Sequence, residues 1–295
     1  MGPATPARVE AAAATVDPAA DDATRRFTRR AQDYARARPA YPQAVADELV
    51  RLLALAPGAH VVDIGCGTGL SCLPFLRAGL RVTGLEPNEG MRRHAQALAA
   101  DWPALRIGDG RAEATGLADG SADLLVAAQA FHWFDVPAAQ AEALRVLRRP
   151  ACAALIWNDR RATGSPFAEG YEALLRRFSR DYLEIRHRHG RADRLASFFG
   201  SASWSTLELA HCDRLDFDLL AARLNSASYM PGPDRPEHAA MMQALRDLFD
   251  ATAHDGRVTM DFDTRVLYGA IQMGDSAGGS ARGGAPGGPP APVPT

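Results

Sequence analysis

Lysine is absent from this chain of 295 residues, in which arginine supplies all 33 basic residues. Reactions that need a lysine amine, such as Schiff-base formation or phosphate binding by the lysine of a nucleotide loop, are therefore excluded. The four cysteines form no CxxC pair and show no metal-ligand spacing. They are typical of reduced thiols, and we expect neither a disulfide nor a metal site.

Long apolar runs and an excess of basic charge are also missing. No segment is long and apolar enough to span a bilayer, and the N-terminus lacks the cationic region and apolar core of a secretory signal. The formal net charge of −2 favours neither nucleic acid nor an anionic membrane as a partner. We therefore predict a cytoplasmic protein that binds no nucleic acid and no membrane; the sequence does not fix its oligomeric state.

The two ends of the chain lack the large apolar residues that a folded core requires. Residues 1–23 are rich in Ala, Pro, Thr and Asp, and residues 274–295 are mostly Gly, Ala, Pro and Ser. Such segments bury too little surface to offset the entropy of ordering, so both are predicted to be disordered tails. Between them we expect a core over residues 24–160 and a C-terminal part with a cap over residues 161–273.

Between the tails, short apolar strands alternate with helical patterns. Five strands are expected at residues 60–64, 81–85, 105–107, 123–128 and 152–157, separated by helices at 69–78, 88–99 and 137–148 after a first helix at 42–56. This alternation predicts an α/β fold with a doubly wound, mostly parallel sheet behind an N-terminal helical lid. Strands at 203–209 and 258–270 would bring the sheet to seven, and a helical cap would come from residues 166–186, 217–230 and 236–253.

The most informative segment is VVDIGCGTG, which runs from Val61 to Gly69. An apolar strand ends there in a glycine turn, and the next apolar strand ends in the acid Glu86. Such a unit binds an adenosine, because the turn lets the backbone approach the ligand and the carboxylate accepts hydrogen bonds from the ribose hydroxyls.

Two residues distinguish the possible adenosine cofactors. The dinucleotide motif G-x-G-x-x-G requires glycine at position 70, where this chain has Leu70 and places its third glycine at Gly69 instead. Asp63, directly before the turn, would repel the pyrophosphate of a nicotinamide cofactor but attract the ammonium and sulfonium groups of S-adenosylmethionine. The loop is therefore predicted to bind S-adenosylmethionine.

Further motifs extend this pattern over residues 26–272. DIGCGTG is followed by VTGLEPNEGM, GRAE, VAAQAFHWFD and ALIWN, with YARARPAYP before the first strand and SASYMP late in the chain. In these motifs the chain resembles the class I S-adenosylmethionine-dependent methyltransferases, and more narrowly the small-molecule branch that includes trans-aconitate methyltransferase-like proteins. The resemblance implies a Rossmann-like fold and methyl transfer to a small organic molecule, with a carboxylate or another oxygen as acceptor.

The resemblance also implies which residues hold the cofactor. The glycine loop and the end of the fourth strand would surround its methionine part, through Asp63, Gly65, Cys66, Gly67 and Gln129. Glu86, followed by Pro87, would bind the ribose, and the GRAE motif would place Ala112 and Glu113 near the adenine.

Candidates for the acceptor site lie in other motifs. His132 of QAFHWFD would act as a base or hydrogen-bond donor, or would only shape the pocket together with Trp133. Arg38 would clamp a carboxylate of the cofactor or the acceptor, or would pair with a surface acid. Further candidate contacts are Tyr34, Tyr41, Asn158 and Tyr229. In the basic run 186–194 two histidines lie two residues apart with no acid at ligand spacing, which favours a solvated loop.

One alternative function remains open at this point. A regulatory or scaffold protein that holds the cofactor without turnover would keep the glycine loop, but it would not need the aromatic wall expected from QAFHWFD. A nicotinamide oxidoreductase is disfavoured by Asp63 and Leu70.

Overall fold

In the computed structural model, the described residues are 38–179, 182, 192–200, 204–227 and 229–272. Several predictions lie outside these residues: both disordered tails (1–23 and 274–295), the helical lid before residue 38, Tyr34, and most of the basic run 186–194. Within the described ranges, no helix is sufficiently long and apolar to cross a membrane.

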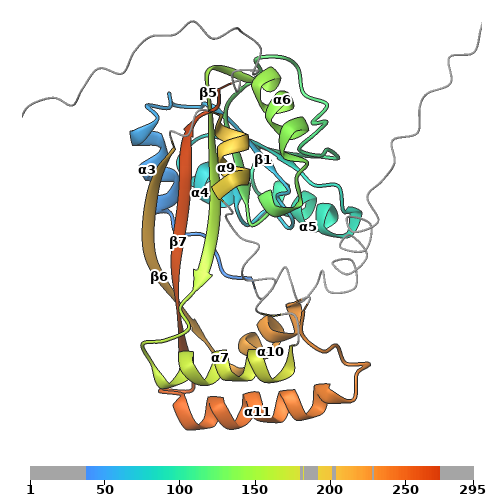
Figure 1. Cartoon of the computed structure of the whole chain (residues 1–295), viewed down its shortest axis with the longest axis vertical. Helices are drawn as coiled ribbons and strands as arrows, with labels where there is room; N and C mark the ends of the chain where they lie inside the picture. Colours follow the sequence, from blue (N-terminus) through green and yellow to red (C-terminus); the bar gives the residue numbers. More distant parts are fainter. Residues whose placement is uncertain (1–37, 180–181, 183–191, 201–203, 228, 273–295) are drawn as a thin grey trace, which may run out of the picture.

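Seven strands form one sheet in the order β3-β2-β1-β4-β5-β7-β6 (Figure 1). Their bounds are β1 (His60–Ile64), β2 (Arg81–Leu85), β3 (Leu105–Gly108), β4 (Ala122–Ala128), β5 (Leu147–Arg160), β6 (Ser205–Leu215) and β7 (Val258–Ala270). The first five strands are parallel, whereas β7 is antiparallel to both of its neighbours, β5 and β6. The prediction of a mostly parallel, Rossmann-like sheet of seven strands is confirmed.

Helices cover both faces of this sheet. Successive residues of the central strands point to opposite sides, so that Val61 and Leu124 join one buried cluster and Val62 and Leu125 join the other. The first cluster is covered by α3 (Ala44–Leu52), α4 (Cys72–Arg77) and α5 (Glu89–Ala99). The second is covered by α6 (Val136–Val146) and α9 (Ala192–Phe199). Burial on both faces explains why the central strands are continuous apolar runs.

Helix α9 is an element that the sequence analysis did not predict. It begins inside the basic run that we expected to be a solvated loop, and it buries Phe198 and Phe199 against the sheet. Arg194 on this helix donates to the carbonyl oxygens of Phe131 and Phe134, at 3.3 and 2.8 Å. For the described end of the run, the prediction of a solvated loop is therefore wrong, because Arg194 serves two buried backbone carbonyls.

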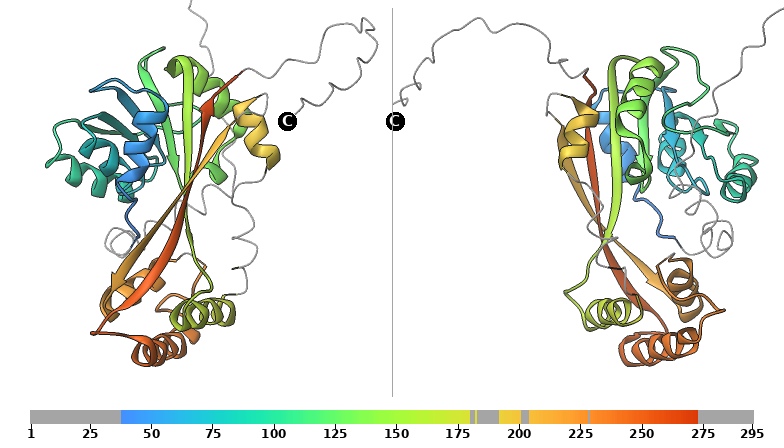
Figure 2. Two further views of the ribbon diagram at one scale, coloured as in Figure 1. Left: turned by 90° about the vertical axis from the view of Figure 1, so that its left-hand side faces the viewer. Right: turned by 45° about the vertical axis from the view of Figure 1, so that its right-hand side comes forward.

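The strands β5, β6 and β7 are longer than a sheet of this kind requires. They contain 14, 11 and 13 residues and run beyond the other strands into a cap. Figure 1 and Figure 2 show this cap at the far end of the three strands, built from α7 (Pro166–Phe178), α10 (Phe217–Ser226) and α11 (Glu237–Thr252). The cap helices pack on the strand ends through a third buried cluster that includes Tyr171 and Phe262. The cap therefore stands beyond the carboxyl end of β5, where the glycine loop also lies.

Candidate active site

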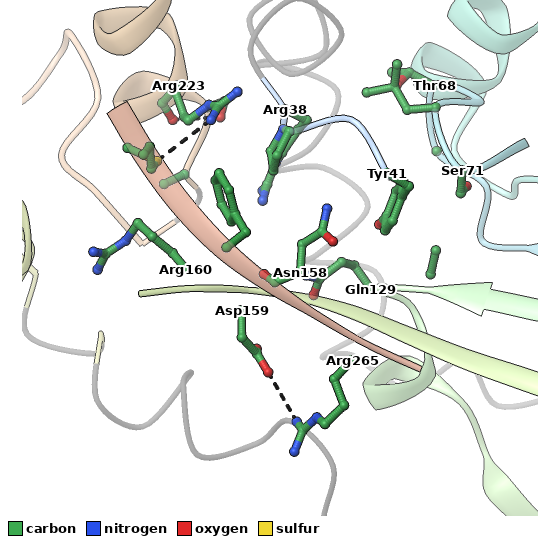
Figure 3. A pocket seen from close by; sticks show the side chains of 18 of the residues that line it. Arg38, Tyr41, Thr68, Ser71, Gln129, Asn158, Asp159, Arg160, Arg223 and Arg265 are labelled. Atoms are coloured by element: carbon green, nitrogen blue, oxygen red, sulfur yellow. Dashed lines mark hydrogen bonds and ion pairs between the residues drawn. The ribbon is translucent and has the colours of Figure 1, made fainter. Parts of the chain in front are cut away.

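A cavity of about 410 Å³ lies between the glycine loop and the cap. At one end it is lined by Thr68 and Ser71, and at the other by Arg160 and Arg223 of the cap side (Figure 3). Residues 38–41 and the carboxyl ends of β4 and β5 form the stretch between these ends. The cavity is thus continuous from the predicted cofactor loop to the cap.

The glycine loop is held close to the second strand. The amides of Gly65 and Cys66 both donate to the carbonyl of Leu85, at 2.8 and 3.1 Å. Gly65 has a φ of +68°, and a Cβ built at this position would lie only 2.7 Å from Cβ of Ala130. Both the backbone angle and the space therefore require glycine here. The turn places Cys66 and Gly67 in the wall of the cavity.

Asp63 is fully buried beneath this loop. Its Oδ2 accepts hydrogen bonds from the Ser71 hydroxyl and, at 3.4 Å, from the Cys72 thiol. Its Oδ1 is also buried and has no hydrogen-bond partner among the residues that the structure describes. Burial raises the pKa of Asp63 to about 7. Of the two side chains, Ser71 lines the cavity and Asp63 lies behind it.

Glu86 lies at the end of β2, where the acid was predicted. Its Oε1 accepts from the Asn88 amide at 2.8 Å, and its Oε2 accepts from the Gly67 amide at 2.9 Å. Burial raises the pKa of Glu86, although these two backbone amides and Arg92 oppose the shift. An ionised carboxylate offers about four acceptor positions. Glu86 therefore holds the glycine loop in place and keeps acceptor capacity for further donors.

Gln129 has an unusual backbone conformation at the end of β4. Its φ is +56°, which is rare for a residue other than glycine and costs about 1–3 kcal/mol. The conformation is held by two bonds, from its amide to the carbonyl of Ile156 at 2.9 Å and from its Nε2 to the carbonyl of Asn158 at 3.2 Å. Because Gln129 lines the cavity, this strained residue marks the place where a ligand would be contacted.

Four arginines are among the described residues that line the cavity, whereas Asp159 is the one acid in that set. Arg160 donates to Oε2 of Glu172 at 2.5 Å and to the Tyr182 hydroxyl at 3.1 Å. Arg223 and Asp213 form an ion pair of 2.8 Å. The other two arginines are Arg38 and Arg265. Arg265 is paired with Asp159 at 3.4 Å. Each guanidinium carries five N–H donors, more than these pairs use, so the lining can still donate hydrogen bonds to an anionic group of a ligand.

Tyrosines line the same cap end. Burial raises the pKa of Tyr171 and of Tyr229, and the positive charges of Arg160 and Arg38 oppose the shift at Tyr229. Their phenols therefore remain neutral and can donate hydrogen bonds at physiological pH. The rings of Tyr182 and Tyr229 lie 5.5 Å apart.

Comparison with known proteins agrees with this geometry. A family model described as a methyltransferase domain matches residues 62–153, from β1 into β5. An uncharacterized methyltransferase of Mycobacterium tuberculosis is 36% identical over 127 residues, which are 43% of this chain and 49% of the relative. The malonyl-acyl-carrier-protein O-methyltransferase of Serratia marcescens is 34% identical over 123 residues, which are 41% and 47% of the two chains. Residues 62–153 therefore form a methyltransferase domain.

A solved structure shows the same fold over more of the chain. The structure of a type II methyltransferase from Anaeromyxobacter dehalogenans has a TM-score of 0.58 and 24% identity, and it covers 79% of this chain and 98% of its own. By contrast, the chain spans about half the length of the curated relatives described above. The narrower trans-aconitate branch stays a prediction.

The structure brings some of the predicted site residues together and leaves others apart. The cavity lining includes Arg38, Tyr41, Cys66, Gly67, Gln129, Asn158 and Tyr229. Of the described residues, a second group lies outside that lining: Asp63, Gly65, Glu86, Pro87, Ala112, Glu113, His132 and Trp133. Two residues of that group are hydrogen-bonded to residues that line the cavity. Glu86 accepts from the Gly67 amide, and Asp63 accepts from the Ser71 hydroxyl.

The aromatic motif QAFHWFD is mainly part of the core. Phe131 and Phe134 are 2% and 8% exposed and pack edge to face at 5.7 Å. His132 lies against Trp133, with ring centroids 4.7 Å apart, and Trp133 is 47% exposed. The motif therefore does not form the expected wall of the described cavity, because its buried rings serve the packing of α9 on the sheet.

Sequence reasoning missed most of the cap end. Tyr171, Arg223 and Phe262 line the cavity from three separate elements, α7, α10 and β7, and Tyr182 lines it from outside them. Each looks like an ordinary helix or strand residue in its own segment. The available signal was that polar residues continue after Trp157, since Asn158, Asp159 and Arg160 all contribute to the cavity lining.

Proposed function

We propose that this protein transfers the methyl group of S-adenosylmethionine to a carboxylate oxygen of a small organic acid. The observation that carries the proposal is the single cavity that joins the glycine loop to an end rich in arginine and tyrosine. The name of the Serratia marcescens relative, an O-methyltransferase, supports the choice of oxygen as the acceptor atom.

The residues of the loop end fit S-adenosylmethionine. Gly65 permits the tight turn that puts Cys66 and Gly67 in the cavity wall, and Glu86 keeps acceptor capacity for the ribose hydroxyls. The buried Oδ1 of Asp63, without a partner among the described residues, would be satisfied by the ammonium group, directly or through a water. S-adenosylmethionine supplies a methyl group activated by its sulfonium.

The residues of the cap end would hold and orient the acceptor. Arg38 and Arg223 would bind its negative charge, while Phe262 and Met260 would cover its apolar body. A carboxylate is already ionised at neutral pH, so the protein need not supply a base. Its contribution is then alignment of the acceptor oxygen and exclusion of water from the reacting atoms.

A turnover screen tests this function. Release of S-adenosylhomocysteine is measured against panels of small carboxylic acids, phenols and amines, and we expect turnover with carboxylic acids. Replacing Arg38 with glutamine is expected to raise the acceptor KM about 10–100-fold, because a hydrogen bond to a charged group is worth about 1.5–3 kcal/mol. The matched control is Arg93→Gln on the surface of α5, which should change nothing.

Two results of this screen would contradict the proposal. Cofactor binding without turnover on any panel would favour the alternative of a regulatory or scaffold protein. Turnover confined to amines would show that the acceptor class is wrong. An unchanged KM in Arg38→Gln would remove this arginine from the acceptor site.

Cofactor affinity is expected to increase with pH, because the pKa of Asp63 is about 7 in the free protein. Below that pH the carboxyl is protonated, whereas the ammonium of the cofactor favours the ionised form. Binding at pH 6 should therefore be about tenfold weaker than at pH 8. Calorimetry in buffers of different ionisation enthalpy should show proton release on binding. Asp63→Asn should abolish both effects; a pH-independent affinity in the unmodified protein would contradict the assignment.

A further inference from the structure

Asn158 links the acceptor cavity to three neighbouring segments, two through its side chain and one through its backbone carbonyl. Its Nδ2 donates to the carbonyl of Ala40 at 3.3 Å, and its Oδ1 accepts from the hydroxyl of Thr264 at 2.7 Å. Its backbone carbonyl accepts from Gln129. Ala40 lies between Pro39 and Tyr41, which line the cavity. Asn158 therefore fastens the segment 38–41, including Arg38, to the end of the sheet.

Thr264 is placed by strand register to reach this amide. It lies directly opposite Asn158 in the antiparallel pair of β5 and β7, and it is 0% exposed. Such directly opposed side chains approach each other across a pair of strands. On its other side, the Thr264 oxygen lies 3.1 Å from Nδ1 of His211, which belongs to β6. The hydroxyl thus bridges the outermost strand and the cavity.

The direction of every proton in this chain of bonds is determined. The carbonyl of Ala40 can only accept, so Asn158 presents its NH₂ group there and its Oδ1 to Thr264. The single hydroxyl proton of Thr264 is then donated to Oδ1. Thr264 must accept from His211, which therefore carries its proton on Nδ1.

The environment of His211 agrees with a neutral ring protonated on Nδ1. Its Nε2 is buried and meets no hydrogen-bond partner at ordinary distance and angle in the described part of the chain. Burial lowers the pKa of His211, which favours the neutral form, although Asp213, Asp263 and the nearby backbone of Ala40 act in the opposite direction. The ring stacks on Phe262, a residue of the cavity wall, with centroids 5.1 Å apart.

We infer that Thr264 is a positioning residue of the acceptor site: its hydroxyl, oriented by His211, sets the Asn158 amide so that it holds Arg38 and Tyr41 over the cavity. The kinetic consequence rests on the proposed methyl transfer, whereas the arrangement of hydrogen bonds does not. Thr264 lies behind the wall, and its effect on the acceptor passes through Asn158 and the 38–41 segment.

Kinetics of Thr264→Val and Thr264→Ser test this role. Valine has nearly the shape of threonine but lacks the hydroxyl, so the acceptor KM should rise about five- to tenfold, as expected for the loss of about 1 kcal/mol from one neutral hydrogen bond. The kcat and the dissociation constant of S-adenosylmethionine should stay within about twofold of the unmodified protein. Serine keeps the hydroxyl and should restore the KM.

Three kinetic results would overturn the inference. An unchanged KM in Thr264→Val would show that the hydroxyl has no role in the site. Equal effects of valine and serine would assign the change to packing. If the dissociation constant of S-adenosylmethionine rose by the same factor as the acceptor KM, the substitution would have disturbed the whole cavity.

A readout without turnover separates this inference from the proposed function. In protein labelled with ¹⁵N-histidine, His211, identified by its loss in His211→Phe, should show the Nδ1–H tautomer and should lose it in Thr264→Val but not in Thr264→Ser. The backbone amide signals of Ala40 and Tyr41 should shift in the same variant. An Nε2–H tautomer in the unmodified protein, or unshifted amide signals, would refute the arrangement even if no acceptor were turned over.

Discussion

Replacing Glu86 with alanine is expected to weaken the binding of S-adenosylmethionine by about 100-fold or more. Two hydrogen bonds from the ribose hydroxyls to a charged acceptor would be lost, each worth about 1.5 kcal/mol or more. The amides of Gly67 and Asn88 would also lose their acceptor, which loosens the glycine loop itself. Titration calorimetry measures the dissociation constant directly.

Two further variants show whether the carboxylate is responsible. Glu86→Gln keeps one acceptor oxygen but turns an NH₂ group toward a backbone amide, so its affinity should lie between those of the unmodified protein and Glu86→Ala. Glu89→Ala removes an exposed acid three residues along, which is paired with Arg93, and should leave affinity unchanged. A loss of less than about threefold in a folded Glu86→Ala variant would assign the ribose to another residue.

Replacing Gly65 with alanine should lower the free energy of unfolding by about 3 kcal/mol and abolish measurable cofactor binding. The φ of +68° costs a residue with a side chain about 1–2 kcal/mol, and the contact of 2.7 Å with Cβ of Ala130 adds an overpacking cost of about 1–3 kcal/mol. Relief of that contact would move the turn that lines the cavity. Urea unfolding measures the first effect and calorimetry the second.

Gly58→Ala is the matched control for this substitution. Gly58 has a similar φ of +71°, but a Cβ there meets nothing within 4 Å among the described residues. Its variant should lose about 1–2 kcal/mol and bind the cofactor normally. If Gly65→Ala is no less stable than Gly58→Ala, the close approach to Ala130 does not constrain the loop.

The elements of the core could be predicted from sequence because their signals are local. The bounds of β1, β2 and β7 match the expected residues, since each is an apolar run or a strict alternation that ends at a clear break. The extension of β5 could not be predicted in this way. Asn158, Asp159 and Arg160 have little strand propensity alone, and they are extended because β7 pairs with them.

The candidate site also has one part that local sequence signals predict and one part that only the tertiary structure assembles. Most of the predicted cofactor end lies within residues 63–87, so spacing and residue type were enough to propose it. The acceptor end joins Arg38 to Arg223 and Phe262, which only the fold brings together. Asn158 was predicted, but its partner Thr264 appeared to be one residue of an alternating strand, and the choice of face and register that joins them is a tertiary property.

The three long strands β5, β6 and β7 also affect which parts of the protein can change during evolution. The polypeptide leaves the sheet for α7 after β5 and for α10 and α11 after β6, and it returns from the second of these excursions along β7, which is hydrogen-bonded to both β5 and β6. Insertions at these two excursions would reshape the compartment for the acceptor while the backbone around the nucleoside stays fixed. A new acceptor specificity can thus arise through changes in two segments of the chain, while the part of the core proposed to bind the methyl donor is kept.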